Sequence, residues 1–386
     1  MKTTLLTHCR VISPGVDIPN ATVSMRDGRI IEVLSVGAGQ PQADEVIDAA
    51  GAMVLPGFID IHTHGAGGRD VCEADPEGLR TIARTKLAEG VTSFLPTTLT
   101  IASEPLEQTM HVIAAYMKDQ EFARAPAVHV EGPFINPKAV GAQNPAHVRV
   151  PDIAELAKLH AIARVGIVSM AVEMPGGVEF VRAATALGIR CSLAHTQATH
   201  AQFLAAKQAG LAHLTHFCNQ MTPLHHREIG IVGAGLLDSD ILIEVICDRI
   251  HVCTDMLRLV FQTKPLRQMM LITDSIAASH LGDGVFDLGG LAVTVKNAEA
   301  RLDSGALAGS TLRMNVALKN VAEITGLPLQ ELVATTAWNQ AQSLGLPGLG
   351  KVEPGFFADL VLLDGDFNVR AAYVGGERRY QAQGRI

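Results

Sequence analysis

The stretch LPGFIDIHTHGAGG, residues 55–68, joins an apolar run to two histidines and ends in glycines. Side chains alternate along a strand, so His62 and His64 would point toward the same side of it. Two imidazoles that converge at the end of a strand are typical of a metal site. The same pattern also occurs as a pair of partly exposed loop histidines, so the rest of the chain has to decide between the two interpretations.

The composition favours a large globular protein with an apolar core. The chain has 386 residues, of which 48% are hydrophobic and 18% are charged, and this is enough for a sizeable interior. The formal net charge is -8, without a block of lysines and arginines. Sequence-independent binding of nucleic acid needs a basic surface, so no nucleic-acid partner is expected. No apolar run reaches the roughly 18 residues of a membrane-spanning helix, and no membrane partner is expected either.

The six cysteines indicate a reducing compartment. They are scattered without a C-x-x-C pair, and this pattern in a long chain is typical of reduced thiols. The N-terminal residues MKTTLLTHCRVISPG contain a polar Thr-His-Cys-Arg where a signal peptide needs a continuous apolar segment. Together these observations predict a cytoplasmic protein.

Both ends of the chain have strand patterns. Residues 21–37, ATVSMRDGRIIEVLSVG, place an Asp27-Gly28 turn between alternating apolar runs, which predicts a hairpin. Residues 358–381, ADLVLLDGDFNVRAAYVGGERRYQ, repeat this style, with turns at Gly365 and at Gly375-Gly376. The two ends are therefore expected to be rich in β-structure.

The middle of the chain alternates between strand and helix patterns. Strand-like runs recur at residues 92–98, 127–134, 167–176, 190–196, 211–217, 241–252 and 269–275. Helical patterns lie between several of them, at residues 78–90, 152–164, 177–188 and 198–210, and residues 313–344 also have a helical pattern. The helix at 198–210 has a capping-box pattern at Thr199 and Gln202 and is expected to end at Gly210.

This alternation predicts a parallel sheet with helical crossovers. About 300 residues of it would fit a (β/α)8 barrel. A doubly wound open sheet is the alternative, but no G-x-G-x-x-G motif follows an early strand.

Unusual polar residues stand where the predicted strands end. They are Glu131, His195, His216, Asp248, His251 and Asp274. In a barrel, catalytic groups come from the C-terminal ends of several strands. Zinc and iron(II) both accept histidine nitrogen and carboxylate oxygen, and such a metal polarises a carbonyl and activates water. An aspartate opposite the metal can move a proton to a leaving amine. The residues therefore predict metal-assisted hydrolysis of an amide or a related bond.

The motifs resemble one family from end to end, the N-acetylglucosamine-6-phosphate deacetylases of the amidohydrolase superfamily. The similar stretches are PGFIDIHTHG, HVEGPFINP, GAQNPAH, AHTQAT, LTHFCNQMTPLHHREIG, DRIHV, LITDSIAA, LAGSTLRM and GKVEPGFFADLVLLD. The resemblance implies an α/β protein, a (β/α)8 TIM barrel with a small β-sandwich domain formed from both chain termini. The barrel would comprise residues 53–348, and the β-sandwich residues 1–52 plus 349–386.

The resemblance also implies roles for individual residues. Glu131, His195 and His216 would hold the main divalent metal, zinc before iron, and His62 and His64 could hold a second ion. Asp274 would be the general acid and base, and Gln143 would assist it at the acetyl group. The substrate, a phosphorylated or otherwise anionic amino sugar, would contact Ala142, Gln143, Asn219, Gln220, Arg227, Asp248, Arg249, His251, Leu307, Ala308 and Gly309. Arg227 reaches the neighbouring subunit's site in this family, which implies a homodimer.

Four positions depart from the family pattern, one of them Arg313 in place of a threonine, and the other three lie in segments expected to contact the substrate. Gln143 replaces a histidine, Gln220 replaces an alanine and Arg249 replaces a small residue. A buried arginine needs an anionic partner, so Arg249 is expected to pair either with a nearby carboxylate or with an additional anionic group of the substrate.

These departures leave three functions open. The first is deacetylation of N-acetylglucosamine 6-phosphate to glucosamine 6-phosphate and acetate, in amino-sugar recycling. The second is hydrolysis of a different anionic N-acyl sugar or lactone by a related amidohydrolase. The third is binding of a sugar phosphate without catalysis. Because Glu131 and Asp274 are both present, the sequence favours an enzyme.

Overall fold

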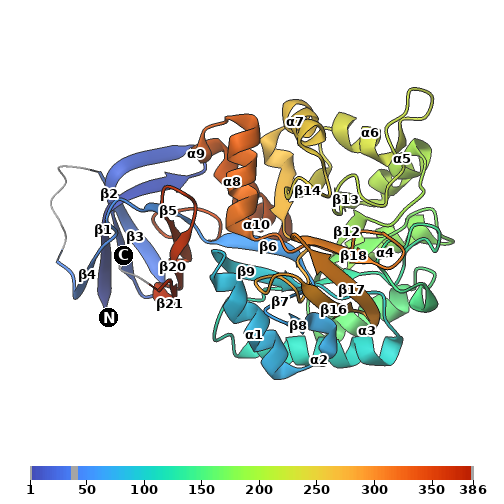
Figure 1. The fold of residues 1–386 in the computed structure, drawn as a ribbon, viewed down its shortest axis with the longest axis horizontal. Coiled ribbons are helices and arrows are strands. Elements are labelled where there is room, and N and C mark those ends of the chain that lie inside the picture. Colours follow the sequence, from blue (N-terminus) through green and yellow to red (C-terminus); the bar gives the residue numbers. More distant parts are fainter. Residues whose placement is uncertain (1, 36–41, 384–386) are drawn as a thin grey trace.

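The computed structural model describes residues 2–35 and 42–383 (Figure 1). The strand pairings make a ring of parallel strands. Six strands pair in the order of the sequence: β10 (Val128–Glu131), β11 (Val165–Met170), β12 (Arg190–Leu193), β13 (Leu211–Leu214), β14 (Leu242–Ile246) and β15 (Met269–Ile272). The two others, β6 (Phe58–Thr63) and β9 (Val91–Pro96), form a separate parallel pair. Isolated bridges from Thr97 to His129 and from Thr63 to Ser275 close the ring.

A helix follows each strand of the ring. The helices are α1 (Pro76–Leu87), α2 (Ser103–Lys118), α3 (Ile153–Ile162), α4 (Gly177–Ala186), α5 (His200–Ala209), α6 (Gly230–Leu237), α7 (Thr254–Thr263) and α8 (Met314–Thr325). Within residues 58–325, which are all described, strand and helix alternate as a (β/α)8 barrel requires. The barrel architecture predicted from the sequence is therefore observed. Among the helices in the described ranges, none has both the length and the apolar content needed to cross a membrane.

Local sequence signals set the ends of these helices, as α5 illustrates. The Thr199 side chain accepts from the backbone N–H of Gln202, and the Gln202 side chain accepts from the backbone N–H of Thr199. Gly210 ends the helix with a φ of 116°, which is unfavourable for a residue with a Cβ atom. The predicted capping box and helix end are both confirmed.

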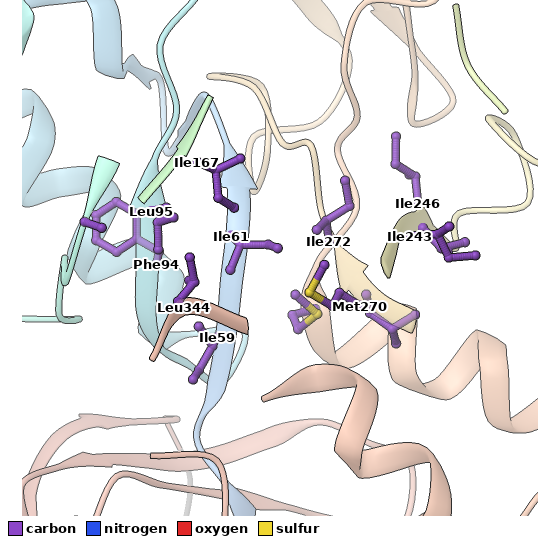
Figure 2. Close-up of a cluster of buried hydrophobic side chains, with 14 of the residues drawn as sticks. Ile59, Ile61, Phe94, Leu95, Ile167, Ile243, Ile246, Met270, Ile272 and Leu344 are labelled. Carbon is purple, nitrogen blue, oxygen red and sulfur yellow. The ribbon is translucent and has the colours of Figure 1, made fainter. Parts of the chain in front are cut away.

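The two faces of a ring strand carry different kinds of side chain. In β6, Ile59 and Ile61 alternate with Asp60 and His62. Figure 2 shows the two isoleucines in a buried apolar cluster with side chains of β9, β11, β14 and β15 and with Leu344 of α10 (Trp338–Leu344). Burial of each large apolar side chain contributes about 1.5–3 kcal/mol. The polar residues of β6 can therefore occupy the other face of the strand.

The terminal segments build a second sheet, at the left in Figure 1. Its strands are β1 (Thr3–Ser13), β2 (Val16–Arg26), β3 (Arg29–Leu34), β4 (Glu45–Asp48), β5 (Met53–Pro56), β19 (Leu360–Leu363), β20 (Val369–Val374) and β21 (Glu377–Gln381). The order is β21-β20-β19-β5-β1-β2-β3, with β4 beside β1, so β19 from the C-terminal part pairs with β5 from the N-terminal part. A hydrophobic cluster of its own joins residues from both parts.

The predicted turns of this sheet are confirmed. Asp27 and Gly28 connect β2 to β3 with φ angles of 51° and 77°, and Gly375-Gly376 connects β20 to β21. β5, which the expected boundary at residue 52 leaves in the barrel, pairs with β1 and β19 in the terminal sheet. The division into two domains and the β-sandwich arrangement stay predictions.

An insertion between β15 and α8 was not predicted. It is a three-stranded antiparallel sheet of β16 (Gly284–Leu288), β17 (Leu291–Lys296) and β18 (Glu299–Leu302). The shorter elements are β7 (Gly65–Ala66), β8 (Arg69–Asp70), η1 (Val71–Glu73), η2 (Pro145–His147), η3 (Leu266–Gln268), η4 (Val333–Thr336) and α9 (Leu329–Leu332). The segments η4, α9 and α10 confirm the helical pattern seen at residues 313–344.

We expect Asp359→Asn to lower the free energy of unfolding by about 2 kcal/mol, because Asp359 ties the terminal sheet to the barrel. Its buried carboxylate accepts from Arg124 Nε at 2.8 Å, from Arg124 Nη2 at 3.1 Å and from the backbone N–H of Gly375 at 2.6 Å. Urea denaturation measures the change. The control is Asp17→Asn, which removes the more exposed pair with Arg10 and should change the stability by less than about 1 kcal/mol. Equal effects of the two substitutions would contradict the prediction.

Candidate active site

The predicted metal ligands and the predicted base lie at one rim of the barrel. Glu131 is the last residue of β10, and His62 lies next to the end of β6. His195, His216 and Asp274 each lie two residues beyond a ring strand, after β12, β13 and β15. This is the C-terminal rim, where barrel enzymes carry their catalytic groups.

Three of these residues have an unfavourable backbone conformation. The φ angles of His195, His216 and Asp274 are 44°, 32° and 51°. The left-handed region costs about 1–2 kcal/mol for a residue with a Cβ atom. Such outliers persist only where the surroundings hold them, and they concentrate at functional sites.

Glu131 lies against two histidines on one side. Its Oε1 atom is 3.1 Å from His216 Nε2 and 3.4 Å from His195 Nε2. The two Nε2 atoms are themselves only 3.1 Å apart. The three side chains are nearly or fully buried, so their donor atoms converge on a point that is shielded from bulk water.

The other two histidines contact the same carboxylate, one at each oxygen. His64 Nε2 is 3.2 Å from Glu131 Oε2, and His62 Nε2 is 3.5 Å from Glu131 Oε1. The two ring nitrogens are 3.2 Å from one another. Asp274 Oδ1 is 3.3 Å from His64 Nε2 and 3.5 Å from His62 Nε2. The predicted ligands and the predicted base are thus brought together.

This donor set suits a divalent cation. Glu131, His195 and His216 form one group whose ligand atoms lie within 4.8 Å of each other, and His62, His64 and Glu131 form another. Imidazole nitrogen and carboxylate oxygen are the ligands that zinc and iron(II) accept. Facing ring nitrogens about 3 Å apart are a poor arrangement without a proton or a cation between them. The residues present therefore fit the metal that the sequence predicts.

Outer hydrogen bonds orient most of the histidines. His64 Nδ1 lies 3.2 Å from the carbonyl oxygen of Thr97, and His195 Nδ1 lies 2.9 Å from that of Ala139. His62 Nδ1 instead faces a carboxylate oxygen of Glu244 at 3.1 Å. Such partners fix the tautomer and leave Nε2 free as a ligand.

Sequence reasoning missed Glu244. It is fully buried in the apolar strand β14. The signal was a single acidic residue within the run ILIEVIC, because a buried carboxylate needs a partner. The sequence does not say which histidine that partner is.

Burial and charge act in opposite directions on the ionisable groups. Burial would lower the pKa of His64, but the carboxylates of Asp274 and Glu131 raise it to about 9. Burial would raise the pKa of Glu131 and of Asp274, but the charge of His62 and the contacts with the other histidines together lower both pKa values. Without a metal, the cluster therefore holds protons that a cation would have to displace.

A pocket of about 180 Å³ opens onto this cluster. Its walls include several of the predicted substrate contacts: Ala142, Gln143, Asn219, Gln220, His251, Leu307 and Gly309. Leu288 of β16 and Ala306 also line it, so the unpredicted insertion forms part of the wall. Ala308 lies in the same loop but is buried, and its backbone N–H donates to Ala300.

The Gln143 side chain is fixed at both ends of its amide. Its Oε1 atom accepts from the backbone N–H of Thr100 at 2.7 Å, and its Nε2 atom donates to Glu131 Oε2 at 2.6 Å. An amide nitrogen has two hydrogens, so one remains for the pocket. Gln143 thus orients the central carboxylate.

Asp248 orients the imidazole ring of His251 through its Nδ1 atom. Its Oδ2 atom is 2.6 Å from His251 Nδ1, and its Oδ1 atom accepts from the backbone N–H of Ile250 and of His251 at 2.8 Å each. Burial would lower the pKa of His251, but Asp248 raises it above the ordinary histidine value. Asp248 thus favours the cationic form of His251, which suits an anionic group of a ligand.

The two predicted arginines lie outside the walls of this pocket. Arg227 is exposed on the loop before α6, and its Nη1 atom lies 2.7 Å from His226 Nε2. Arg249 is exposed as well and pairs with Glu323 of α8. The sequence argument assumed a buried Arg249, and the structure has this residue exposed. Of the two expected partners, the carboxylate is the one observed.

Comparison with known proteins agrees with this geometry. The profile of the amidohydrolase family matches residues 53–380. The chain belongs to the amidohydrolase family. The N-acetylglucosamine-6-phosphate deacetylase of Lysinibacillus sphaericus is 33% identical to this amidohydrolase over 362 residues, which are 93% of each chain. The N-acetylgalactosamine-6-phosphate deacetylase of Escherichia coli O157:H7 is 35% identical over 346 residues, 89% of this chain and 92% of that protein.

A solved structure has the same overall fold. It is a variant N-acetyl-D-glucosamine-6-phosphate deacetylase from Mycobacterium smegmatis, in complex with N-acetyl-D-glucosamine-6-phosphate. The TM-score is 0.92 at 30% identity, and the match covers 98% of this chain and 100% of that chain. The amidohydrolase described here is therefore a hydrolase of carbon–nitrogen bonds, which confirms the family and the reaction class inferred from the sequence.

We expect zinc binding to the metal-free amidohydrolase at neutral pH to release protons. His64, with a pKa raised to about 9, is protonated without metal and must be neutral to become a ligand. The apparent affinity for zinc should therefore fall as the pH falls below that value. Titration calorimetry in buffers of different ionisation enthalpy counts the protons. His64→Asn should release fewer of them, and the exposed control His111→Asn the same number as the parent. Equal heats in all buffers would contradict this.

Proposed function

We propose that this amidohydrolase removes the acetyl group from N-acetylglucosamine 6-phosphate and gives glucosamine 6-phosphate and acetate. One observation carries the proposal: the Asp274 carboxylate lies 3.3 Å from His64 Nε2, beside the convergent ligand set and in the wall of a pocket. The names of the relatives supply the substrate class. A substrate-binding role without catalysis would not need this carboxylate.

The cofactor we propose is a divalent cation, zinc before iron. Glu131, His195 and His216 would hold the main ion, and His62 and His64 together with Glu131 would hold a second. When bound, the cation would supply Lewis acidity that activates water and polarises the acetyl carbonyl. The shared carboxylate of Glu131 gives the two sites a common ligand.

The residues of the chain would move the protons. Without a metal, the charges of His62 and His64 lower the pKa of Asp274 against the effect of burial. A bound cation would supply positive charge in their place, so Asp274 would be ionised and could take a proton from water. It would then give that proton to the departing amine. The remaining N–H of Gln143 would donate to the acetyl oxygen as negative charge develops there. As an amide, Gln143 stabilises that charge without being a cation.

The sugar phosphate would be held by cationic and polar groups at the pocket mouth. His251, oriented by Asp248, would bind the phosphate, while Asn219, Gln220 and the loop at residues 307–309 would contact the sugar and the acetyl group. Arg227 would reach the site of a second subunit in a homodimer. A planar guanidinium suits phosphate because it donates two parallel hydrogen bonds. The exposure of Arg227 leaves it accessible for this role.

A second substrate has specific support. The Escherichia coli relative is named for N-acetylgalactosamine 6-phosphate and matches this chain as well as the N-acetylglucosamine-6-phosphate deacetylases do. Gln220 lines the pocket, and its side-chain amide can discriminate by hydrogen bonds between sugars with different hydroxyl positions. The surface pairing of Arg249 with Glu323 gives no support to an extra anionic group on the substrate. We propose the cytoplasm as the location, since all six cysteines are unpaired.

We expect Asp274→Asn to keep its metal and to lose at least about 100-fold in kcat, because the amide cannot accept the proton of water. Acetate release from N-acetylglucosamine 6-phosphate measures turnover, and elemental analysis measures the metal. N-acetylgalactosamine 6-phosphate and unphosphorylated N-acetylglucosamine complete the substrate panel. Near-parental turnover of the variant would refute the role of Asp274. A preference for the galactosamine derivative would replace the proposed substrate.

We expect Arg227→Ala to raise KM about 10- to 100-fold with little change of kcat, since it removes a charged phosphate contact. If Arg227 acts on the neighbouring site, mixing the inactive Asp274→Asn with Arg227→Ala should recover about a quarter of the parental sites after subunit exchange. Activity at low substrate concentration measures the recovery. No recovery after verified exchange would mean that Arg227 does not act across subunits.

A further inference from the structure

A wholly buried lysine lies behind the candidate active site. Lys86 belongs to α1, and none of its side chain is exposed. Its Nζ atom is 2.7 Å from Asp60 Oδ2 and 2.8 Å from Glu89 Oε1, both of them buried carboxylates. Lysine is almost never fully buried unless it is paired. Such a cluster gains little stability over apolar packing, so its presence calls for another reason.

The first link from Lys86 to the site runs through Asp60. This residue lies in β6, two positions before His62, on the same face of the strand. Its carboxylate accepts from Thr273 Oγ1 at 2.5 Å and from the backbone N–H of Thr273 at 3.2 Å. Asp60 therefore joins the strand of the histidine pair to the residue that precedes Asp274.

The second link is direct. Lys86 Nζ donates to Thr273 Oγ1 at 3.2 Å and lies 3.5 Å from Ser275 Oγ, at the limit of a hydrogen bond. Ser275 Oγ in turn donates to the carbonyl oxygen of Gly65 at 2.9 Å. Thr273 and Ser275 are the two neighbours of Asp274 in the chain. The ammonium group thus touches the segment on both sides of the proposed base.

That segment needs support because of its backbone. Asp274 has a φ of 51°, a conformation that a residue with a Cβ atom leaves readily unless its neighbours are held. Its own N–H donates to the carbonyl oxygen of His62 at 2.9 Å, and its carbonyl oxygen accepts from Ser310 at 2.8 Å. These backbone hydrogen bonds hold Asp274 itself. The side-chain hydrogen bonds of Thr273 and Ser275 hold the residues before and after it.

We propose that Lys86 is a positioning residue for the reaction. Lys86 holds Asp274 in place through Thr273, Ser275 and Asp60. The inference rests on the proposed role of Asp274 as the base. It assigns no contact between Lys86 and the substrate. A displacement of Asp274 by about 1 Å would slow proton transfer strongly while the pocket walls stay in place.

A role in stability alone would give a different result. If the ion cluster were purely structural, the loss of Lys86 would change the amount of folded protein. The kcat per folded, metal-loaded molecule would stay the same. If Lys86 positions Asp274, its loss lowers kcat itself. KM and the metal content then stay near their parental values, because the pocket walls and the metal ligands are untouched. The separation of kcat from KM therefore distinguishes the two.

The experiment compares Lys86→Met with Lys264→Met in the full-length protein. Lys264 is a matched control, because it is another buried lysine, donates to the carbonyl oxygen of Asp238 at 2.6 Å and follows α7. We expect Lys86→Met to lose at least about 10-fold in kcat per bound metal, with KM changed less than about twofold. Lys264→Met should keep kcat. A kcat of Lys86→Met within about twofold of the parent would overturn the proposal.

Thr273→Val decides the question if Lys86→Met does not fold. Valine has nearly the shape of threonine and leaves all three buried charges paired, but it removes the hydroxyl between Lys86 and Asp60. We expect about a threefold to tenfold loss of kcat at constant KM, and an unchanged kcat would overturn the proposal. Asp274→Asn is measured in parallel. If it stays active, the proposed function fails; if it is inactive while Lys86→Met or Thr273→Val is fully active, only the positioning role fails.

Discussion

The buried carboxylate of Glu131 is the interaction on which the rest of the site depends. One of its oxygens faces His216 and His195, and the other faces His64 and the amide of Gln143. A buried carboxylate is stable only when positive charge or hydrogen-bond donors surround it. The three histidines follow β6, β12 and β13, and Gln143 lies in the loop after β10, so the ends of four strands have to meet around this carboxylate.

The barrel satisfies this requirement at the expense of backbone strain. His195, His216 and Asp274 all adopt left-handed conformations directly after their strands. At these turns the side chains of His195 and His216 contact Glu131, and that of Asp274 contacts His64. Rigid surroundings hold these turns, and below Asp274 they include the buried charges of Lys86 and Asp60. The strain and the ionic cluster are two parts of one arrangement that aims the carboxylate of Asp274 at the histidines.

Sequence patterns were informative wherever one residue type has a narrow range of uses. The Asp27-Gly28 turn, the Thr199 cap and the alternation of strand and helix each reflect a local backbone preference, and each is observed. Polar residues at strand ends predicted the site for a similar reason, since apolar strands that end in histidine or carboxylate are rarely accidental. Arg249 shows the limit, because its sequence context does not say whether its side chain faces the pocket or the surface. Its partner Glu323 lies on a helix far along the chain.

By itself, the sequence predicted the barrel, the terminal strands and the candidate groups for metal binding and proton transfer, because periodicity and residue chemistry are local properties. Only the tertiary structure decided which groups meet. Glu244 behind His62, Lys86 behind Asp274 and the insertion at residues 284–302 along the pocket are all pairings between distant segments. A single polar residue in an apolar run indicates that a buried partner is needed. The closure of the ring determines which residue that partner is, since it sets which strands and helices lie side by side.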